Sequence, residues 1–159
     1  MSQKSAGILL YKFDNGQLKV LLVHPGGPYW AKKDLGVWSI PKGLIESNEN
    51  TWHAALREFK EETGFEIKPK HPIALTPVKL KSGKIIYAWA VQGDANPFKV
   101  KSNIFQIEWP PHSGKLQSFP EIDKAAWFDT RTAKTKINSR QAHFIDELVE
   151  KLHNNIQSD

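Results

Sequence analysis

Two apolar runs lie near the N-terminus, at residues 7–11 and 18–23, with a polar stretch between them that contains Asn15 and Gly16. An Asn-Gly pair between two apolar runs favours a tight hairpin turn, because both residues adopt positive φ easily. The pattern therefore predicts two antiparallel strands joined at this turn. The second run is apolar at almost every position, which indicates a strand buried on both faces for much of its length.

Two later segments carry apolar residues at helical spacing. The first covers residues 51–63, with Asn50 or Thr51 as its N-cap and Gly64 in the position that favours a left-handed C-terminal residue. The second runs from about residue 139 to residue 152. Each would bury one apolar face, formed by Trp52, Ala55, Leu56 and Phe59 in the first helix and by Phe144, Ile145, Leu148 and Leu152 in the second.

The remaining chain alternates between short apolar runs and breaker residues. Proline and glycine predict a loop over residues 24–36, and the proline-containing stretch 94–120 is expected to form a long irregular connection. The order of strands, helix, strands and helix is typical of an α/β fold with helices packed on a mixed sheet, in one domain over residues 1–159. The further strands are expected at residues 37–40, 73–75, 78–80, 85–91 and 125–128.

Composition narrows the classes of chemistry. The chain has no cysteine, which excludes disulfides, thiolate zinc sites and thiol nucleophiles and fits a cytoplasmic protein. No apolar run approaches the ~20 residues of a membrane span, so we expect no membrane partner. The formal net charge of +5 favours a phosphorylated partner, but the basic residues are scattered and do not by themselves indicate nucleic-acid binding.

The first predicted helix carries three carboxylates at positions i, i+3 and i+4, namely Glu58, Glu61 and Glu62. Like charges at this spacing repel one another, and they lie in the C-terminal half of the helix, where its dipole disfavours negative charge. A hard divalent cation such as Mg²⁺ would relieve both effects, because it prefers carboxylate oxygens. A solvated acidic face with an Arg57–Glu61 ion pair is the alternative, and the helix alone does not decide between them.

A wider pattern surrounds these carboxylates. From Gly43, five residues lead to Glu49 and seven more lead to Arg57 and Glu58, followed by residues 59–65, Phe-Lys-Glu-Glu-Thr-Gly-Phe. This pattern resembles the signature of the Nudix hydrolases at all nine defined positions over 23 residues. The preceding residues 38–43, Trp-Ser-Ile-Pro-Lys-Gly, are similar to the strand and loop that enter this signature in the family.

The resemblance implies a Nudix fold, an α/β/α sandwich with a mixed sheet, and a divalent-metal-dependent pyrophosphohydrolase. It implies that Glu61 and Glu62 bind Mg²⁺, with Mn²⁺ as a substitute, helped by the carbonyl oxygen of Gly43. Glu58 is implied to be a metal ligand or the general base. Water would then attack a phosphorus of a nucleoside diphosphate linked to another group.

The resemblance also implies supporting roles. Arg57 is expected to orient a neighbouring carboxylate, and Glu49 to support the loop and helix through a salt bridge, while Gly64 is a structural position of the signature. Glu46 stands where many members carry a glutamate, and we interpret it as a surface charge in preference to an auxiliary ligand. The chain departs from many members at two variable positions, which hold Leu44 and Asn48.

Substrate residues are expected outside the signature. Lys42 precedes Gly43 as in dinucleoside-polyphosphate hydrolases of the superfamily, and it is either a phosphate contact or an exposed turn lysine. Glu121 resembles an acidic loop residue that serves in many members as a further ligand or base, with Asp123 as the fallback. Trp30 and Trp109 lie in loops and either stack on a nucleobase or pack beneath the loops. Further candidate phosphate contacts are Lys32, Lys33 and Lys84.

The sequence therefore predicts an enzyme that cleaves a dinucleoside polyphosphate or a nucleoside triphosphate. Removal of pyrophosphate from the 5′ end of RNA stays open, and it is the one way in which nucleic acid would be a partner. A Nudix-fold module that binds a nucleotide without hydrolysing it is the rival class, although the signature carboxylates are intact. An isomerase on this scaffold would typically need a cysteine, and the chain has none.

Overall fold

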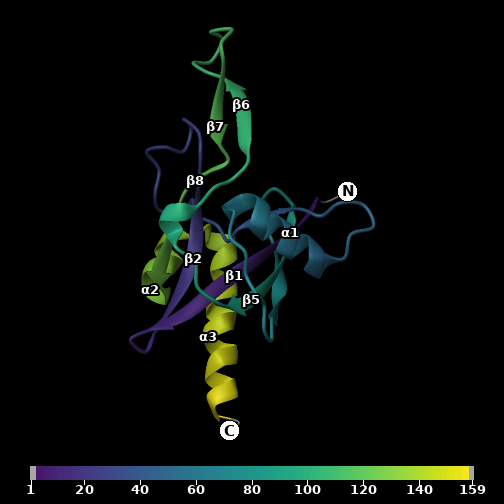
Figure 1. Ribbon diagram of the computed structural model, residues 1–159, viewed down its shortest axis with the longest axis vertical. Helices are drawn as coiled ribbons and strands as arrows, with labels where there is room; N and C mark the ends of the chain where they lie inside the picture. The colour runs from purple at the N-terminus through teal and green to yellow at the C-terminus, as the bar shows by residue number, and fades with distance from the viewer. Residues whose placement is uncertain (1–2, 158–159) are drawn as a thin grey trace.

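The computed structural model describes residues 3–157, in which a mixed β-sheet carries helices on both faces (Figure 1). Five strands follow the order β4-β5-β1-β2-β8, and β3 pairs with β1. These strands span Lys4–Asp14 (β1), Gln17–Pro25 (β2), Lys42–Leu44 (β3), Ile73–Lys79 (β4), Ile85–Gln92 (β5) and Ile122–Asp129 (β8). Because β1 runs antiparallel to β2 but parallel to β5, the predicted mixed sheet is confirmed.

Two layers of side chains separate the sheet from its helices. Helix α1 (Thr51–Thr63) covers one face, and helices α2 (Thr130–Lys136) and α3 (Ala142–Gln157) cover the other (Figure 1). Alternate residues of the central strands enter opposite layers, as the two-residue period of a strand requires. The α1 side includes Ile8, Leu10, Leu21 and Phe59, and the α3 side includes Leu9, Leu22, Phe144, Ile145 and Leu148.

The local signals at the first hairpin and at the first helix are confirmed. Asn15 and Gly16 have φ values of 52° and 78°, so both adopt the left-handed conformation that a two-residue hairpin needs. The Asn50 side chain is the N-cap of α1 and accepts hydrogen bonds from the backbone N–H groups of Trp52 (2.8 Å) and His53 (3.2 Å). Gly64 ends the helix with a φ of 75°.

The strand predicted at residues 37–40 is not formed. The segment makes only isolated bridges, Val23 with Ser39 and Trp38 with Ile137, because the Ile40 N–H donates to the Gln141 side chain at 3.0 Å and not to a neighbouring strand. Trp38 is nonetheless buried in the core.

The long irregular connection predicted over residues 94–120 is wrong in its second half. A short 3-10 helix, Pro97–Lys99, precedes a hairpin of β6 (Ile104–Glu108) and β7 (Leu116–Pro120), which projects away from the main sheet (Figure 1). The prolines do not prevent it, because Pro110 and Pro111 lie in the turn and Pro120 is the last residue of its strand.

The C-terminal helices also differ from the prediction. Helix α2 has no apolar stripe and buries only Ala133, so the spacing of its apolar residues did not predict a helix. Its one local signal is the N-cap Asp129, whose side chain accepts a hydrogen bond from the Thr132 N–H. A 3-10 turn, Ser139–Gln141, precedes α3, which therefore begins three residues later than expected and extends to residue 157. No helix within residues 3–157 is long and apolar enough to cross a membrane.

Candidate active site

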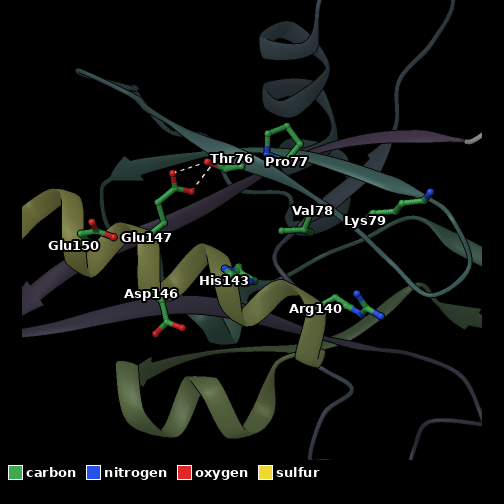
Figure 2. Close-up of a pocket in the computed structure, with 9 residues that line it drawn as sticks. All are labelled: Thr76, Pro77, Val78, Lys79, Arg140, His143, Asp146, Glu147 and Glu150. Atoms are coloured by element: carbon green, nitrogen blue, oxygen red, sulfur yellow. Dashed lines mark hydrogen bonds between the residues drawn. The ribbon is translucent and has the colours of Figure 1, made fainter.

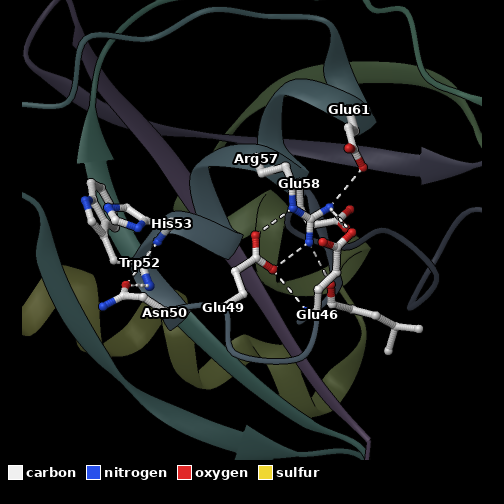
Figure 3. A network of polar contacts seen from close by, with 9 residues as sticks. Glu46, Glu49, Asn50, Trp52, His53, Arg57, Glu58 and Glu61 are labelled. Atoms are coloured by element: carbon white, nitrogen blue, oxygen red, sulfur yellow. Dashed lines mark hydrogen bonds and ion pairs between the residues drawn. The ribbon is translucent and has the colours of Figure 1, made fainter.

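The acidic cluster is organised around the Arg57 guanidinium on the exposed side of α1 (Figure 3). Its Nε and Nη2 atoms donate to the two carboxylate oxygens of Glu49 at 2.7 and 2.8 Å, and Nη2 also donates to the Leu44 carbonyl oxygen at 3.0 Å. Its Nη1 atom donates to Glu58 at 2.7 Å and to Glu61 at 3.2 Å. One side chain therefore joins the loop after β3 to two of the three carboxylates that are predicted metal ligands, Glu58 and Glu61.

The planar fork of an arginine explains why this residue type stands here. It donates two parallel hydrogen bonds to one carboxylate and retains a further donor for others, which a lysine does not do. The hydrogen bonds from Arg57, helped by the backbone N–H of Glu46, lower the pKa of Glu49 to about 2. The Glu46 carboxylate itself is exposed and 3.7 Å from Arg57, which agrees with a surface charge.

Gly43 in β3 lies directly against the Glu58 carboxylate. A Cβ atom added at Gly43 would overlap the carboxylate of Glu58, so the carboxylate can hold its present position only beside a glycine. Burial raises the pKa of Glu58, while the Arg57 hydrogen bond opposes that shift. The spacing between Gly43 and Glu58 thus reflects a close approach between β3 and α1.

Glu62 has the most perturbed environment in the cluster. Its Oε2 atom is buried and has no hydrogen-bond partner in the structure. Burial raises the pKa of Glu62 to about 8, the nearby charges of Glu121 and Glu58 raise it further, and Lys42 opposes the shift. A buried carboxylate oxygen without a partner is costly, and a divalent cation would satisfy it. The donor set of carboxylates therefore fits the implied metal.

Lys42 and Glu121 complete this side of the cluster. Both line a hollow of about 200 Å³ together with Glu62, between the ends of β2, β3 and β8. Burial is the main cause that lowers the pKa of Lys42, the nearby charge of Lys84 adds to it, and Glu62 and Glu58 oppose it. The predicted residues Lys42, Glu58, Glu62 and Glu121 are thus brought together from two elements, β3 and α1, and from the connection between β7 and β8.

Within residues 3–157, no three acidic or histidine side chains are already gathered closely enough to hold a metal ion. The hydrogen bonds of Arg57 account for part of this, because they hold the carboxylates of Glu58 and Glu61. Before they could bind a metal ion, the carboxylates of Glu58 and Glu61 would therefore have to give up their hydrogen bonds to the Arg57 guanidinium.

Comparison with known proteins assigns the family. A family model described as the NUDIX domain matches residues 1–148. The chain belongs to this family. Segments of it are similar to asymmetrical bis(5′-nucleosyl)-tetraphosphatases of Caenorhabditis elegans (36% identity over 62 residues) and Mus musculus (32% over 72 residues). These segments cover 39% and 42% of the present chain.

The chain spans less than half the length of these curated relatives, 41% and 45% respectively. Among solved structures, a C. elegans Ap4A hydrolase in a binary complex superposes with a TM-score of 0.66 at 22% identity, covering 96% of this chain and 98% of that one. The NUDIX domain of Shewanella oneidensis NrtR, complexed with ADP ribose, superposes with a TM-score of 0.59 at 16% identity, covering 98% and 89%. At these identities the superpositions establish the Nudix fold.

The loop residues predicted to bind substrate lie outside the Nudix cluster's hollow. Trp30 is 41% exposed and lies under the Lys33 ammonium at 5.1 Å from the ring centre, and Lys32 is exposed on the same loop. Trp109 packs edge-to-face against Tyr29, with ring centres 5.1 Å apart, where β6 ends. The contact between Tyr29 and Trp109 joins the loop over residues 24–36 to the β6–β7 hairpin.

His24 carries no local signal in the sequence, yet it anchors this loop. Its buried ring is 2.8 Å from the Asp123 carboxylate through Nδ1 and 2.6 Å from the Lys33 carbonyl oxygen through Nε2. Asp123, the fallback for a catalytic carboxylate, is therefore engaged with the loop. The partners are 99 residues apart, so no local pattern could have indicated the pair.

Another hollow lies away from the Nudix residues, between β4 and α3 on the opposite face of the sheet (Figure 2). It measures about 650 Å³. On its wall the Thr76 N–H and Oγ1 donate to the two oxygens of Glu147 at 2.7 and 2.9 Å. This contact covers part of the exposed edge of β4, and the hollow contributes nothing to the acidic cluster.

Proposed function

We propose that this Nudix chain hydrolyses a pyrophosphate bond in a nucleoside diphosphate linked to another group, with Mg²⁺, or Mn²⁺ in its place. The observation that carries the proposal is the unpartnered, buried Oε2 atom of Glu62 within a cluster of carboxylates. A folded protein keeps such a group only if something else compensates for it, and an absent ligand is the simplest compensation.

The chain's own residues divide the work as follows. Glu61, Glu62 and the Gly43 carbonyl oxygen would hold the ion, with Glu58 as a further ligand or as the base. A bound divalent ion supplies charge neutralisation at the phosphate oxygens and a more acidic water. Arg57 would position Glu58 and Glu61, and Lys42 would neutralise a phosphate from inside the hollow.

In the reaction, a water oxygen forms a bond to phosphorus while the bond from phosphorus to the bridging oxygen breaks. The water gives its proton to a carboxylate, and the bridging oxygen leaves with the departing phosphate. Glu58 and Glu121 are the two candidates for the base, because burial raises the pKa of Glu58 and Glu121 borders the hollow that Glu62 and Lys42 also line. A general base of this kind contributes about 10²- to 10⁴-fold.

For the substrate, we favour a dinucleoside polyphosphate, with a nucleoside triphosphate as the second choice. The segments similar to bis(5′-nucleosyl)-tetraphosphatases and the superposition on an Ap4A hydrolase support this choice. Trp30, Trp109 and Lys32 remain candidate contacts for the outer parts of such a substrate.

A substrate panel tests the proposal. The purified protein would be assayed with Mg²⁺ against diadenosine polyphosphates, the common nucleoside triphosphates, ADP-ribose, NADH and 5′-triphosphorylated RNA, and the products identified by chromatography. We expect cleavage of a diadenosine polyphosphate to unequal products. Preferential release of pyrophosphate from RNA would support the alternative, and stoichiometric binding without product would indicate a non-catalytic Nudix module.

A further inference from the structure

A second hollow borders the catalytic helix on the side away from Lys42. It measures about 570 Å³ and lies between the outer face of α1 and the segment of residues 101–103. Leu56, Arg57, Lys60 and Glu61 line it from the helix. Lys101 and Asn103 line the opposite side. Neither Lys101 nor Asn103 belongs to the Nudix signature.

The backbone of this segment is fixed between the helix and the predicted base. The Lys101 N–H donates to the Thr63 carbonyl oxygen at 2.9 Å, at the end of α1. The Asn103 carbonyl oxygen accepts from the Glu121 N–H at 2.8 Å, and the Ser102 hydroxyl accepts from the Ile122 N–H at 2.9 Å. Because backbone atoms make these contacts at residues 101 and 103, the side chains there are free for a ligand.

The charges around the hollow also point to a ligand. Lys60 is paired with Glu66 at 3.0 Å. Lys101, by contrast, has no side-chain hydrogen bond or ion pair to any residue in the described part of the chain. An unpaired, exposed ammonium group beside a carboxylate cluster suits the phosphate of a bound substrate. Leu56 and the lysine stems offer apolar surface for a ribose or base.

The two hollows lie on different sides of the paired glutamates. Neighbouring residues of a helix project about 100° apart, so Glu61 and Glu62 face different directions. Glu62 lines the hollow that holds Lys42, and Glu61 borders the hollow that holds Lys101. A phosphate chain that crosses the carboxylates would therefore meet one lysine before the point of cleavage and another beyond it.

We propose that the hollow between α1 and residues 101–103 is a subsite for the far end of a polyphosphate substrate, with Lys101 contacting a phosphate and Asn103 a polar group of the outer nucleoside. The subsite deepens the proposed function and rests on it. The ligand of this subsite would be a nucleoside phosphate that is joined to the cleaved nucleotide through a chain of several phosphates.

Steady-state kinetics of Lys101→Gln with Mg²⁺ tests the subsite, with diadenosine tetraphosphate and ATP as paired substrates. Gln keeps most of the side-chain length but removes the charge. We expect KM for diadenosine tetraphosphate to rise about tenfold, the scale of one charge-assisted hydrogen bond, with kcat within twofold and a smaller change for ATP. Asn103→Ala should also raise the KM for diadenosine tetraphosphate. Lys101→Arg, which keeps the positive charge, should leave this KM near the wild-type value.

The matched control is Lys99→Gln, which removes an exposed lysine two residues away that does not line the hollow. If Lys101→Gln behaves like this control, or lowers kcat equally for both substrates, the subsite is wrong. Equilibrium binding of diadenosine tetraphosphate in Ca²⁺ separates this result from a failure of the proposed function. If the wild-type protein hydrolyses nothing but binds this nucleotide, and Lys101→Gln weakens binding about tenfold, the subsite stands and the hydrolase assignment falls.

Discussion

At the scale of single residues, the site is a set of carboxylates in which only Glu62 has a buried oxygen without a hydrogen-bond partner among the described residues. Arg57 compensates Glu49, Glu58 and Glu61, but it does not reach the buried oxygen of Glu62. A buried carboxylate oxygen without a partner lowers the stability of the folded protein when no ligand is bound. Residues of binding and active sites often lower stability in this way. Glu62 is therefore the residue at which pH, metal and stability are most directly coupled.

We predict that Glu62→Gln stabilises the metal-free protein at high pH. The pKa of Glu62 is about 8 in the folded state and near 4.5 in the unfolded state, so the folded state holds the extra proton between these values. Stability from this group is therefore lost as pH rises from 4.5 to 8. In EDTA, the melting temperature of the variant should exceed that of wild type at pH 9, with a smaller difference at pH 5.

The same melting experiment includes Mg²⁺ and a control. Mg²⁺ should raise the wild-type melting temperature by mass action but should leave Glu62→Gln almost unchanged. Glu150→Gln, an exposed carboxylate on α3, should show neither effect. An equal response of Glu62→Gln and wild type to both pH and Mg²⁺ would refute the assignment of Glu62 as a metal ligand.

Gly43→Ala tests the close approach of β3 to the helix. The added methyl group would displace the Glu58 carboxylate, so we predict a loss of activity of about 10²-fold, the scale of one misplaced catalytic group, and a destabilisation of about 1–3 kcal/mol. Activity assays and denaturant unfolding measure the two effects. Gly93→Ala is the control, because its methyl group would meet only the end of Leu10 at 3.1 Å. Wild-type activity in Gly43→Ala would contradict the geometry.

At the scale of secondary-structure elements, the site depends on how α1 is held against β3 and the loop that follows it. Arg57 makes this connection through Glu49 and the Leu44 carbonyl oxygen. We predict that Arg57→Lys lowers kcat about tenfold or more with little change in KM, because a lysine does not hold Glu49 and Glu58 together. If kcat is unchanged while the protein merely melts earlier, Arg57 has only a structural role.

Elements with strong local signals were predictable from the sequence. The Asn15–Gly16 turn and the capped helix α1 have their determinants within a few residues, and so has the Nudix spacing. Helix α2 was missed because its residues are polar and only its cap is informative. The β6–β7 hairpin was missed because prolines outweighed the alternation of Phe105 and Ile107.

Contacts between distant elements were not predictable. Lys101 and Asn103 reach the catalytic helix only because Thr63 and Glu121 bind the backbone of their segment. His24 likewise meets Asp123 only in the folded sheet. The signature residues could therefore be recognised from their spacing, whereas the surfaces that we propose to select the substrate required the fold.

At the scale of the whole molecule, the reactive residues gather where α1, β3 and the start of β8 meet. The α3 side of the sheet contributes core packing and a separate hollow. The proposed hydrolytic centre would therefore lie at one end of the sheet, bordered by the hollow that Lys42 lines and by the hollow that Lys101 lines. We propose that this cluster is a metal-dependent centre for pyrophosphate hydrolysis.

The most direct test is the rate of diadenosine tetraphosphate hydrolysis by wild type and Glu62→Gln across a Mg²⁺ titration, with the products identified. We predict that wild type is inactive in EDTA and regains activity with Mg²⁺, and that Glu62→Gln is slower by roughly 10²-fold or more at saturating Mg²⁺, as expected for loss of one preorganised electrostatic group. A wild-type rate in EDTA, or an unchanged rate in Glu62→Gln at saturating Mg²⁺, would contradict the claim.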